Sequence, residues 1–348
     1  MGNNFNAARL AAASLVILGH SYALTGHAAP LWFGIPVHIL AVRAFFVVSG
    51  YLIADSWNRD PDLGRYVLRR ALRILPALAV AVLLTVGVLG PLLTRLPWAA
   101  YFASDETRQY LWNALLAPAF RLPGVFDDGR PLATVNGSLW SIPVEALMYL
   151  ALPLYGLARA RLCRQVLLPL AVVGALAASF YFRAMRPDAI DPVFYWTSLP
   201  FALQYSSEFT LAAAVRIWRL ERYLSVWAAL VLAAGLALLP APASVAGSLV
   251  VVPYGVLALC LAPAPRLRWR SDVSYGVYLY GFPVQQMVIS WLGPGVHPLG
   301  LTALALAGGY ALGWLSWHGV ERWALRLKPG GVRRGPAPAG AAAEVLAR

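Results

Sequence analysis

The chain has 348 residues, of which 60% are hydrophobic and only 12% are charged, and its formal net charge is +13. Soluble proteins carry about a quarter charged residues, so this composition excludes an ordinary soluble enzyme. The positive charge lies in short segments between apolar runs and not along one continuous groove, so nucleic acid is not an expected partner. The two cysteines, Cys163 and Cys260, are far from any Cys or His pattern that would hold zinc, and no metal is expected.

Apolar runs of about 20 residues recur along the chain, which is the length that a helix needs to cross a membrane. We therefore predict an all-α integral membrane protein with ten spans in a single bundle. The approximate ranges are 7–26, 33–54, 74–94, 138–158, 163–183, 194–215, 223–240, 243–262, 272–292 and 299–320. Residues 1–328 form the predicted transmembrane domain, and the Gly-, Pro- and Ala-rich residues 329–348 are predicted to be a disordered tail.

The positions of arginine and lysine between these spans predict the orientation of the bundle. Every even-numbered connection and the segment after the last span are basic: Arg59–Arg73, Arg159–Arg164, Arg216–Arg222, Arg266–Arg270 and Arg322–Lys328. Cytoplasmic loops carry the excess of Lys and Arg, so we expect both termini in the cytoplasm. The prediction is a multi-pass protein of the inner (cytoplasmic) membrane, with membrane lipid as a partner.

The long connection between the third and fourth predicted spans, from about Arg95 to Gly137, is rich in aromatic residues. They are Trp98, Tyr101, Phe102, Tyr110, Trp112, Phe120 and Phe126. Two interpretations are open. The connection is either an aromatic belt at the membrane interface with a short surface helix, or a lid that carries sugar-stacking aromatic side chains at the outer mouth.

Ionisable residues inside spans are costly and therefore mark candidate functional positions. They are His20, His38, Arg43, Glu145, Glu208 and His318. At 1.5 Å per residue, His20, Glu145 and Arg43 lie roughly 9, 10 and 13 Å below the outer ends of their helices. Because isolated charges at such depths are strongly disfavoured, we expect these three side chains to share a hydrated or paired pocket.

Two groups of basic residues suggest binding of a long anionic substrate. Arg9 and His20 lie three helical turns apart on one face, roughly 16 Å along the axis, so a thin substrate could place its charged head at Arg9 and its reactive end at His20. The alternative is that Arg9 is a topology anchor and His20 a packing residue. The run Arg69–Arg73 offers guanidinium groups that suit phosphates, or an anchor for anionic lipid.

Five stretches resemble, in order and at the usual separations, the hallmarks of the acyltransferase 3 family. They are the Arg9 to His20 spacing, FFVVSGYLI at 45–53, RRALRILPA at 69–77, NGSLWSIPVEALMY at 136–149 and VSYGVYLYGFPV at 273–284. The resemblance covers nearly the whole membrane domain. It implies a ten-helix bundle, acetyl-CoA or another acyl-CoA as donor substrate with no permanently bound cofactor, and a carbohydrate acceptor such as lipopolysaccharide or exopolysaccharide.

The resemblance also implies roles for single residues. His20 matches the essential histidine of the first span, and Arg9 matches the basic residue of the same motif. Arg70 and Arg73 match the family's Arg-x-x-Arg pair, with Arg69 beside them as a further candidate for donor binding.

Other matched positions belong to motifs within the spans. They are Ser49 and Gly50 of a Ser-Gly turn, Glu145 of the Trp-Ser-x-x-x-Glu pattern that begins at Trp140 and Ser141, and Tyr275 and Tyr278 of the ninth span. One departure is Gly281, where the family often has a histidine. We therefore assign no role to a second histidine in that span.

These parts predict an O-acyltransferase, most simply an O-acetyltransferase, in which His20 is the general base for a hydroxyl that attacks a thioester. Glu145 would orient His20 or relay its proton, and Arg43 would offset charge or polarise the carbonyl. An acyl-enzyme on Ser49 or Ser141 stays open. The alternative from another class is a transporter or flippase whose polar residues line a permeation path.

Overall fold

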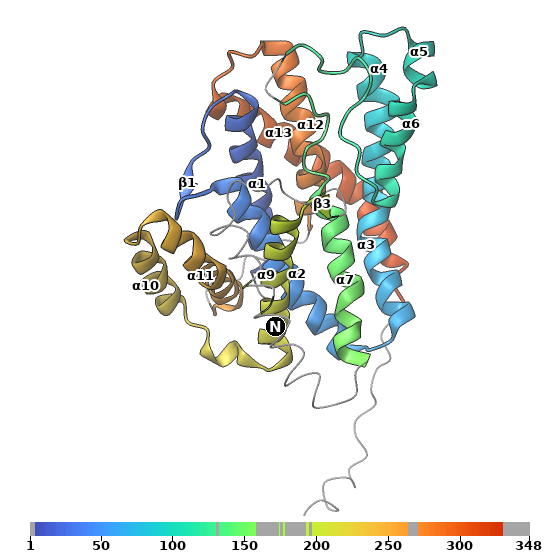
Figure 1. The fold of residues 1–348 in the computed structure, drawn as a ribbon. Coiled ribbons are helices and arrows are strands. Elements are labelled where there is room, and N and C mark those ends of the chain that lie inside the picture. The colour runs from blue at the N-terminus through green and yellow to red at the C-terminus, as the bar shows by residue number, and fades with distance from the viewer. Residues whose placement is uncertain are drawn as a thin grey trace, which may run out of the picture.

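A computed structural model describes residues 4–129, 132–157, 174, 177, 193–194, 197–263 and 271–329. Helices dominate this part of the chain and pack side by side in a bundle (Figure 1). The strands described are two short antiparallel pairs: β1 (Leu31–Trp32) with β2 (Ile35–Pro36), and β3 (Val193–Phe194) with β4 (Thr197–Ser198). The predicted all-α character is confirmed.

The first half of the bundle contains α1 (Phe5–Leu24), α2 (Val37–Arg59), α3 (Leu63–Leu84), the π-helical turn η1 (Thr85–Leu89), α4 (Gly90–Leu93), α5 (Trp98–Ala103), α6 (Asp105–Leu111), η2 (Trp112–Leu115) and α7 (Ser141–Leu157). The second half contains α9 (Leu199–Ile217), η5 (Leu220–Tyr223), α10 (Val226–Ala237), α11 (Ala241–Leu261), α12 (Ser274–Leu292), α13 (Pro298–Ser316), η6 (Trp317–Glu321) and α14 (Arg322–Arg326). We call the end where α1 begins and α14 ends the inner end, and the opposite end the outer end.

Five helices among the described residues are long and apolar enough to cross a membrane: α1, α2, the continuous Leu63–Leu93, α11 and the continuous Pro298–Arg326. Helices α7, α9, α10 and α12 also coincide with predicted spans. The predicted span 163–183 lies outside the described residues except for residues 174 and 177, and nearly all of the predicted tail lies outside them as well. The structure therefore shows a membrane-type helical bundle, and the count of ten spans stays a prediction.

The third predicted span begins earlier than hydropathy indicates. Helix α3 starts at Leu63 rather than near residue 74, and its N-cap Asp62 accepts a hydrogen bond from the backbone N–H of Arg65. The arginines of the first turns lowered the hydropathy there, although long basic side chains can extend to the membrane surface from a helix. As a result Arg69, Arg70 and Arg73 lie on a helix and not in a connecting loop.

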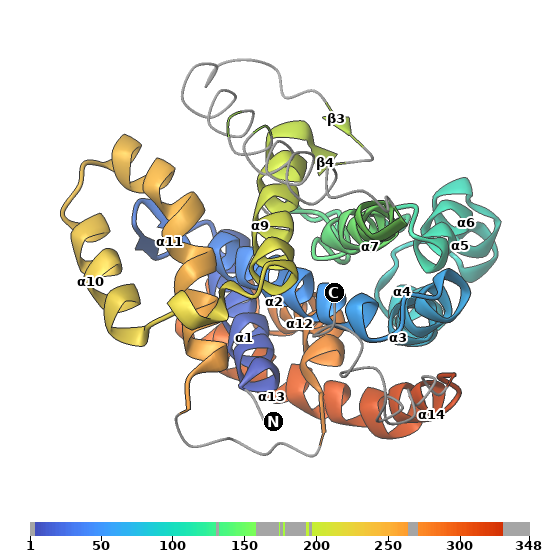
Figure 2. The ribbon, with the colours of Figure 1, turned by 90° about the horizontal axis from the view of Figure 1, so that it is seen from below.

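Helices α1, α2 and α12 form the centre of the bundle, where α1 packs against both others and α2 packs against α9 (Figure 2). Gly50 permits the close approach of α2 and α9, because a Cβ atom there would collide with the carbonyl oxygen of Phe209. Gly281 of α12 faces α1, and a Cβ atom there would lie 2.7 Å from Ile17. The position where the family often has a histidine is thus closely packed in this chain.

The described residues of the connection from Arg95 to Gly137 pack against the bundle in two places. Its first part, α5 and α6, lies along the outer part of α3 (Figure 1) and buries Tyr101, whose hydroxyl donates to the carbonyl of Val86 at 2.9 Å. Its last part is held against α12 because Gln286 donates to the carbonyls of Leu132 and Thr134, at 2.7 Å each. This last part forms a wall of the outer cavity described below.

Candidate active site

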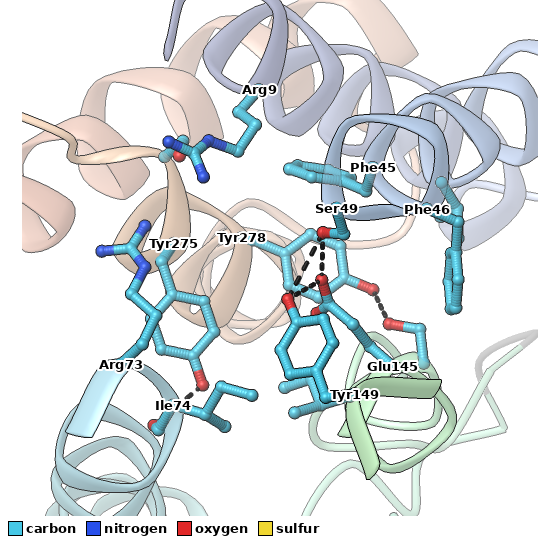
Figure 3. Close-up of a pocket in the computed structure, with 14 residues that line it drawn as sticks. Arg9, Phe45, Phe46, Ser49, Arg73, Ile74, Glu145, Tyr149, Tyr275 and Tyr278 are labelled. Atoms are coloured by element: carbon cyan, nitrogen blue, oxygen red, sulfur yellow. Dashed lines mark hydrogen bonds between the residues drawn. The ribbon is translucent and has the colours of Figure 1, made fainter. Parts of the chain in front are cut away.

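An inner cavity of about 70 Å³ lies between α1, α2, α3, α7 and α12 (Figure 3). Residues from the sequence motifs line it together, although they are far apart in the chain. They include Arg9, Ser49, Arg73, Glu145, Tyr275 and Tyr278. The structure therefore brings together most of the residues that resemble the family's motifs.

The carboxylate of Glu145 is the centre of a polar cluster in this cavity (Figure 3). Ser49 Oγ donates a hydrogen bond to Glu145 Oε1, and the hydroxyl of Tyr149 donates to the same oxygen at 2.5 Å. Glu145 of α7 thus acts as a hydrogen-bond acceptor inside the cavity. Its hydrogen bond from Ser49 joins α7 to α2.

A second cluster at the inner end joins Arg9 of α1 to Arg73 of α3. Both guanidinium groups bind the same oxygen of Asp272, at 2.9 and 2.7 Å, and Arg73 also reaches Glu321 at 3.3 Å. Burial disfavours a charged Asp272, but the positive charges of Arg73 and Arg9 outweigh this and hold its pKa below the usual value. Asp272 therefore fixes the two arginines relative to each other.

Arg69 and Arg70, the other two arginines of the run Arg69–Arg73, have different surroundings. Arg69 binds Asp60 at 2.6 Å, and Arg65 binds the other oxygen of that carboxylate at 2.7 Å. These hydrogen bonds hold the pKa of Asp60 well below its usual range. Arg70 has no acidic partner among the described residues, and its guanidinium lies 5.9 Å from the ring centre of Tyr66.

An outer cavity of about 470 Å³ lies between α1, α2, α9, α12 and the last part of the connection before α7. His20 and His38 lie in its wall with ring centroids 5.4 Å apart, and the rings of Phe282 and His20 form a T-shaped pair with centroids 5.1 Å apart. The Nδ1 atom of each histidine is buried and has no hydrogen-bond partner among the described residues. Aromatic side chains complete the walls: Phe120, Trp140 and Phe201.

The structure does not bring His20, Glu145 and Arg43 into the one pocket that their similar depths suggested. His20 lines the outer cavity and Glu145 the inner one. Arg43 lines neither: it is fully buried, pairs with Glu208, and donates to the hydroxyl and carbonyl of Ser248 at 2.8 and 2.7 Å. Helix rise gives the depth of a residue but not the side of the helix that it occupies. Residues at equal depth can therefore line different cavities.

Sequence reasoning missed several residues of these sites. His38 was an ionisable residue within a span but received no role, and Asp272 and Glu321 were not considered as partners of the arginines. A search for carboxylates at the inner ends of the ninth and tenth spans would have found both acids, since buried arginines need such partners. Tyr149 lies one turn after Glu145 and was detectable by helical spacing alone.

Comparison with known proteins adds to this geometry. A sequence model described as an acyltransferase domain matches residues 3–318. An "O-acetyl transferase" of Shigella phage Sf6 is 30% identical over 340 residues, which cover 94% of this chain and 97% of the relative. "Nodulation protein 10" of Rhizobium leguminosarum bv. viciae is 28% identical over 367 residues, which cover 95% of each. No solved structure matches the chain.

The apolar helical bundle and these matches define a membrane-embedded acyltransferase. The chain belongs to the acyltransferase 3 family, as the five motifs indicated.

Proposed function

We propose that the protein transfers an acyl group, most simply acetyl, from cytoplasmic acyl-CoA to a carbohydrate hydroxyl on the outer side of the inner membrane. One observation carries the proposal. Arg9 and His20 lie on the same helix α1, yet Arg9 lines the inner cavity and His20 the outer cavity. A donor that enters at one end and an acceptor that enters at the other can then meet within the bundle.

The donor suits the inner cavity in charge and in length. The arginine residues at the inner end would hold the phosphates of the nucleotide, since guanidinium groups bind phosphate oxygens in pairs. The cavity of about 70 Å³ is too small for the nucleotide, and in this proposal it takes part of the pantetheine chain, whose reach is comparable to the distance of roughly 16 Å from Arg9 to His20. Glu145 would accept hydrogen bonds from the amide N–H groups of this chain.

The acceptor suits the outer cavity. Its volume of about 470 Å³ falls in the range of roughly 300–1,000 Å³ that is usual for small-molecule sites. Trp140 and Phe120 offer flat apolar faces on which a sugar ring can stack, while His20 offers an unpaired imidazole nitrogen. Lipopolysaccharide and exopolysaccharide are acceptors of this chemical class.

The proposed reaction is direct transfer with His20 as general base. His20 takes the proton of the acceptor hydroxyl while that oxygen bonds to the thioester carbonyl carbon. The carbon–sulfur bond then breaks, and the proton passes to the leaving sulfur, which gives the ester, free CoA and neutral His20. For Arg43, which is bound to Glu208 and Ser248, we propose a structural role in place of an electrostatic one.

The test is transfer of label from radioactive acetyl-CoA to glycan in membranes that contain the protein. His20→Ala should lower the rate by about 10²- to 10⁴-fold, the usual contribution of a general base, without loss of membrane insertion. His318→Ala is the matched control, because His318 bonds to the carbonyl of Trp314 outside both cavities and should leave the rate unchanged. Absence of label transfer by the wild-type protein would favour a transporter instead.

A further inference from the structure

The inner and outer cavities are separate spaces, divided by a layer about one helical turn thick. Among the residues that the structure describes, none lines both cavities. On α2, His38 lines the outer cavity and Val42 the inner one, and on α12 Phe282 and Tyr278 divide in the same way. Each pair is four positions apart, which is roughly 6 Å along a helix. A donor thioester in the inner cavity must therefore cross this layer to reach His20.

Two aromatic side chains meet in this layer (Figure 3). Tyr278 is the inner-cavity residue of α12 that lies nearest to the outer cavity, and Phe45 contacts it from α2. The two rings form a T-shaped pair with centroids 5.4 Å apart. Val42 and Ile142 add apolar bulk beside them. The inner cavity is thus closed toward the outer cavity by rings and aliphatic groups, which exclude water.

The start of α7 holds Tyr278 in this closed position. The hydroxyl of Tyr278 donates to the carbonyl of Ser138 at 2.9 Å and lies 2.6 Å from the hydroxyl of Ser141. Because a phenol has one hydrogen to donate, Ser141 is the donor of the second bond. Gly137 and Trp140 of the same segment line the outer cavity. An acceptor that contacts Gly137 and Trp140 therefore acts on the segment that holds Tyr278.

We propose that Phe45 and Tyr278 form a gate between the two cavities, and that an acceptor in the outer cavity opens it. This inference rests on the proposed function, which needs the two substrates to meet. The closed gate protects the donor thioester from water, a competing nucleophile. Opening in response to the acceptor completes the site only when the correct nucleophile is present, which is the advantage of induced fit.

Side-chain rotation is enough to open this gate. Both rings border the empty space of the inner cavity, about 70 Å³, so each has room on one side. Tyr278 is held by hydrogen bonds from its hydroxyl, and their loss frees the ring to move to another rotamer. Tyr278 is a positioning residue in this scheme, because it controls access to the reacting atoms without bonding to them.

The first measurement is the accessibility of a cysteine in the inner cavity. Ser49→Cys is made in a protein whose two native cysteines are replaced by alanine. A membrane-impermeant methanethiosulfonate is added on the side of the membrane from which His38→Cys, in the outer cavity, reacts. Tyr278→Phe keeps the ring but loses both hydrogen bonds, so it should raise the labelling rate of Ser49→Cys about tenfold. Phe45→Ala removes half of the gate and should raise it at least as much.

The matched control is Tyr275→Phe. Tyr275 lies on the same helix, lines the same cavity and donates to the carbonyl of Ile74 at 3.1 Å, but it lies toward the inner end. Its loss of a hydroxyl should leave the labelling rate unchanged. Labelling of Ser49→Cys as fast as that of His38→Cys, with the gate residues intact, would show that no partition exists. An unaltered rate in both gate variants would also overturn the proposal.

The second measurement concerns the control of the gate by the acceptor. Without glycan, water that reaches the thioester carbonyl breaks the carbon–sulfur bond and gives acetate and free CoA. This hydrolysis of acetyl-CoA should be slow in the wild type and about tenfold faster in Tyr278→Phe and Phe45→Ala, since the closed state is weakened in both. Hydrolysis by the wild type as fast as its transfer to glycan would refute opening by the acceptor.

Cysteine labelling separates the gate from the proposed function, because it needs neither donor nor acceptor. Faster labelling in the gate variants, combined with no label transfer to glycan by the wild type, would refute the transferase proposal but not the gate. Label transfer by the wild type with unaltered labelling in both variants would refute the gate alone.

Discussion

The imidazole rings of His20 and His38 lie with their centroids 5.4 Å apart at the wall of the outer cavity. Gly19 makes this pairing possible, because a Cβ atom at that position would collide with the His38 ring. Both Nδ1 atoms lack hydrogen-bond partners among the described residues. The proposed acceptor would therefore meet both rings at this wall.

The first prediction concerns His38 as a positioning residue for the acceptor. His38→Phe keeps a ring but removes its hydrogen bonds, so we expect the acceptor KM to rise about tenfold while kcat stays within about twofold. Transfer from acetyl-CoA to de-O-acylated surface glycan at varied glycan concentrations measures both constants. Gly19→Ala should have the same effect, because the new methyl group displaces His38. An unaltered KM in both variants would contradict the assignment.

The second prediction concerns Ser49, which donates its hydrogen bond to Glu145 in the inner cavity. If acyl transfer is direct, Ser49→Ala removes one of the two donors to this carboxylate and should lower kcat/KM for the donor by about tenfold. Tyr149→Phe removes the other donor and should act similarly. Intact-protein mass spectrometry of His20→Ala after incubation with acetyl-CoA should show no acetyl group on Ser49. An acetylated Ser49 would instead establish an acyl-enzyme.

The third prediction concerns the buried pair of Arg43 and Glu208, both fully enclosed between α2, α9 and α11. Removal of one partner leaves an uncompensated buried charge, so Arg43→Met should destabilise the protein by about 3–5 kcal/mol. Replacing both, as Arg43→Met/Glu208→Leu, should recover most of this loss. Unfolding in detergent measures the stability. Recovery of stability without recovery of transfer would show that this pair takes part in the reaction.

The sequence predicted where the helices lie better than which residues meet. Hydropathy placed α1 and α11 within a few residues, because the hydrophobic length of a span is fixed by the membrane. It could not place Arg9 beside Asp272, which is 263 positions away, because such contacts depend on how the helices are arranged around each other. The family resemblance pointed to Ser49 and Glu145 as residues of two motifs. Only the structure shows that the two side chains are hydrogen-bonded to each other.

The sequence likewise did not predict which residues of the candidate site share a cavity. Depth along a helix suggested that His20 and Glu145 share a pocket, yet the two residues line different cavities. A helix has residues at equal depth on opposite faces, and hydrophobic periodicity could not separate them because nearly every face of these helices is apolar.

The fourth prediction concerns orientation. Reporters fused after Lys328, or inserted between Arg159 and Arg164, should report the cytoplasm, and a reporter near Asp127 should report the outside. The segment 159–164 lies outside the described residues, so this arm of the test rests on the distribution of basic residues alone. A cytoplasmic signal at Asp127 would show that the bundle has the opposite orientation. The proposed sides of donor and acceptor would then be exchanged.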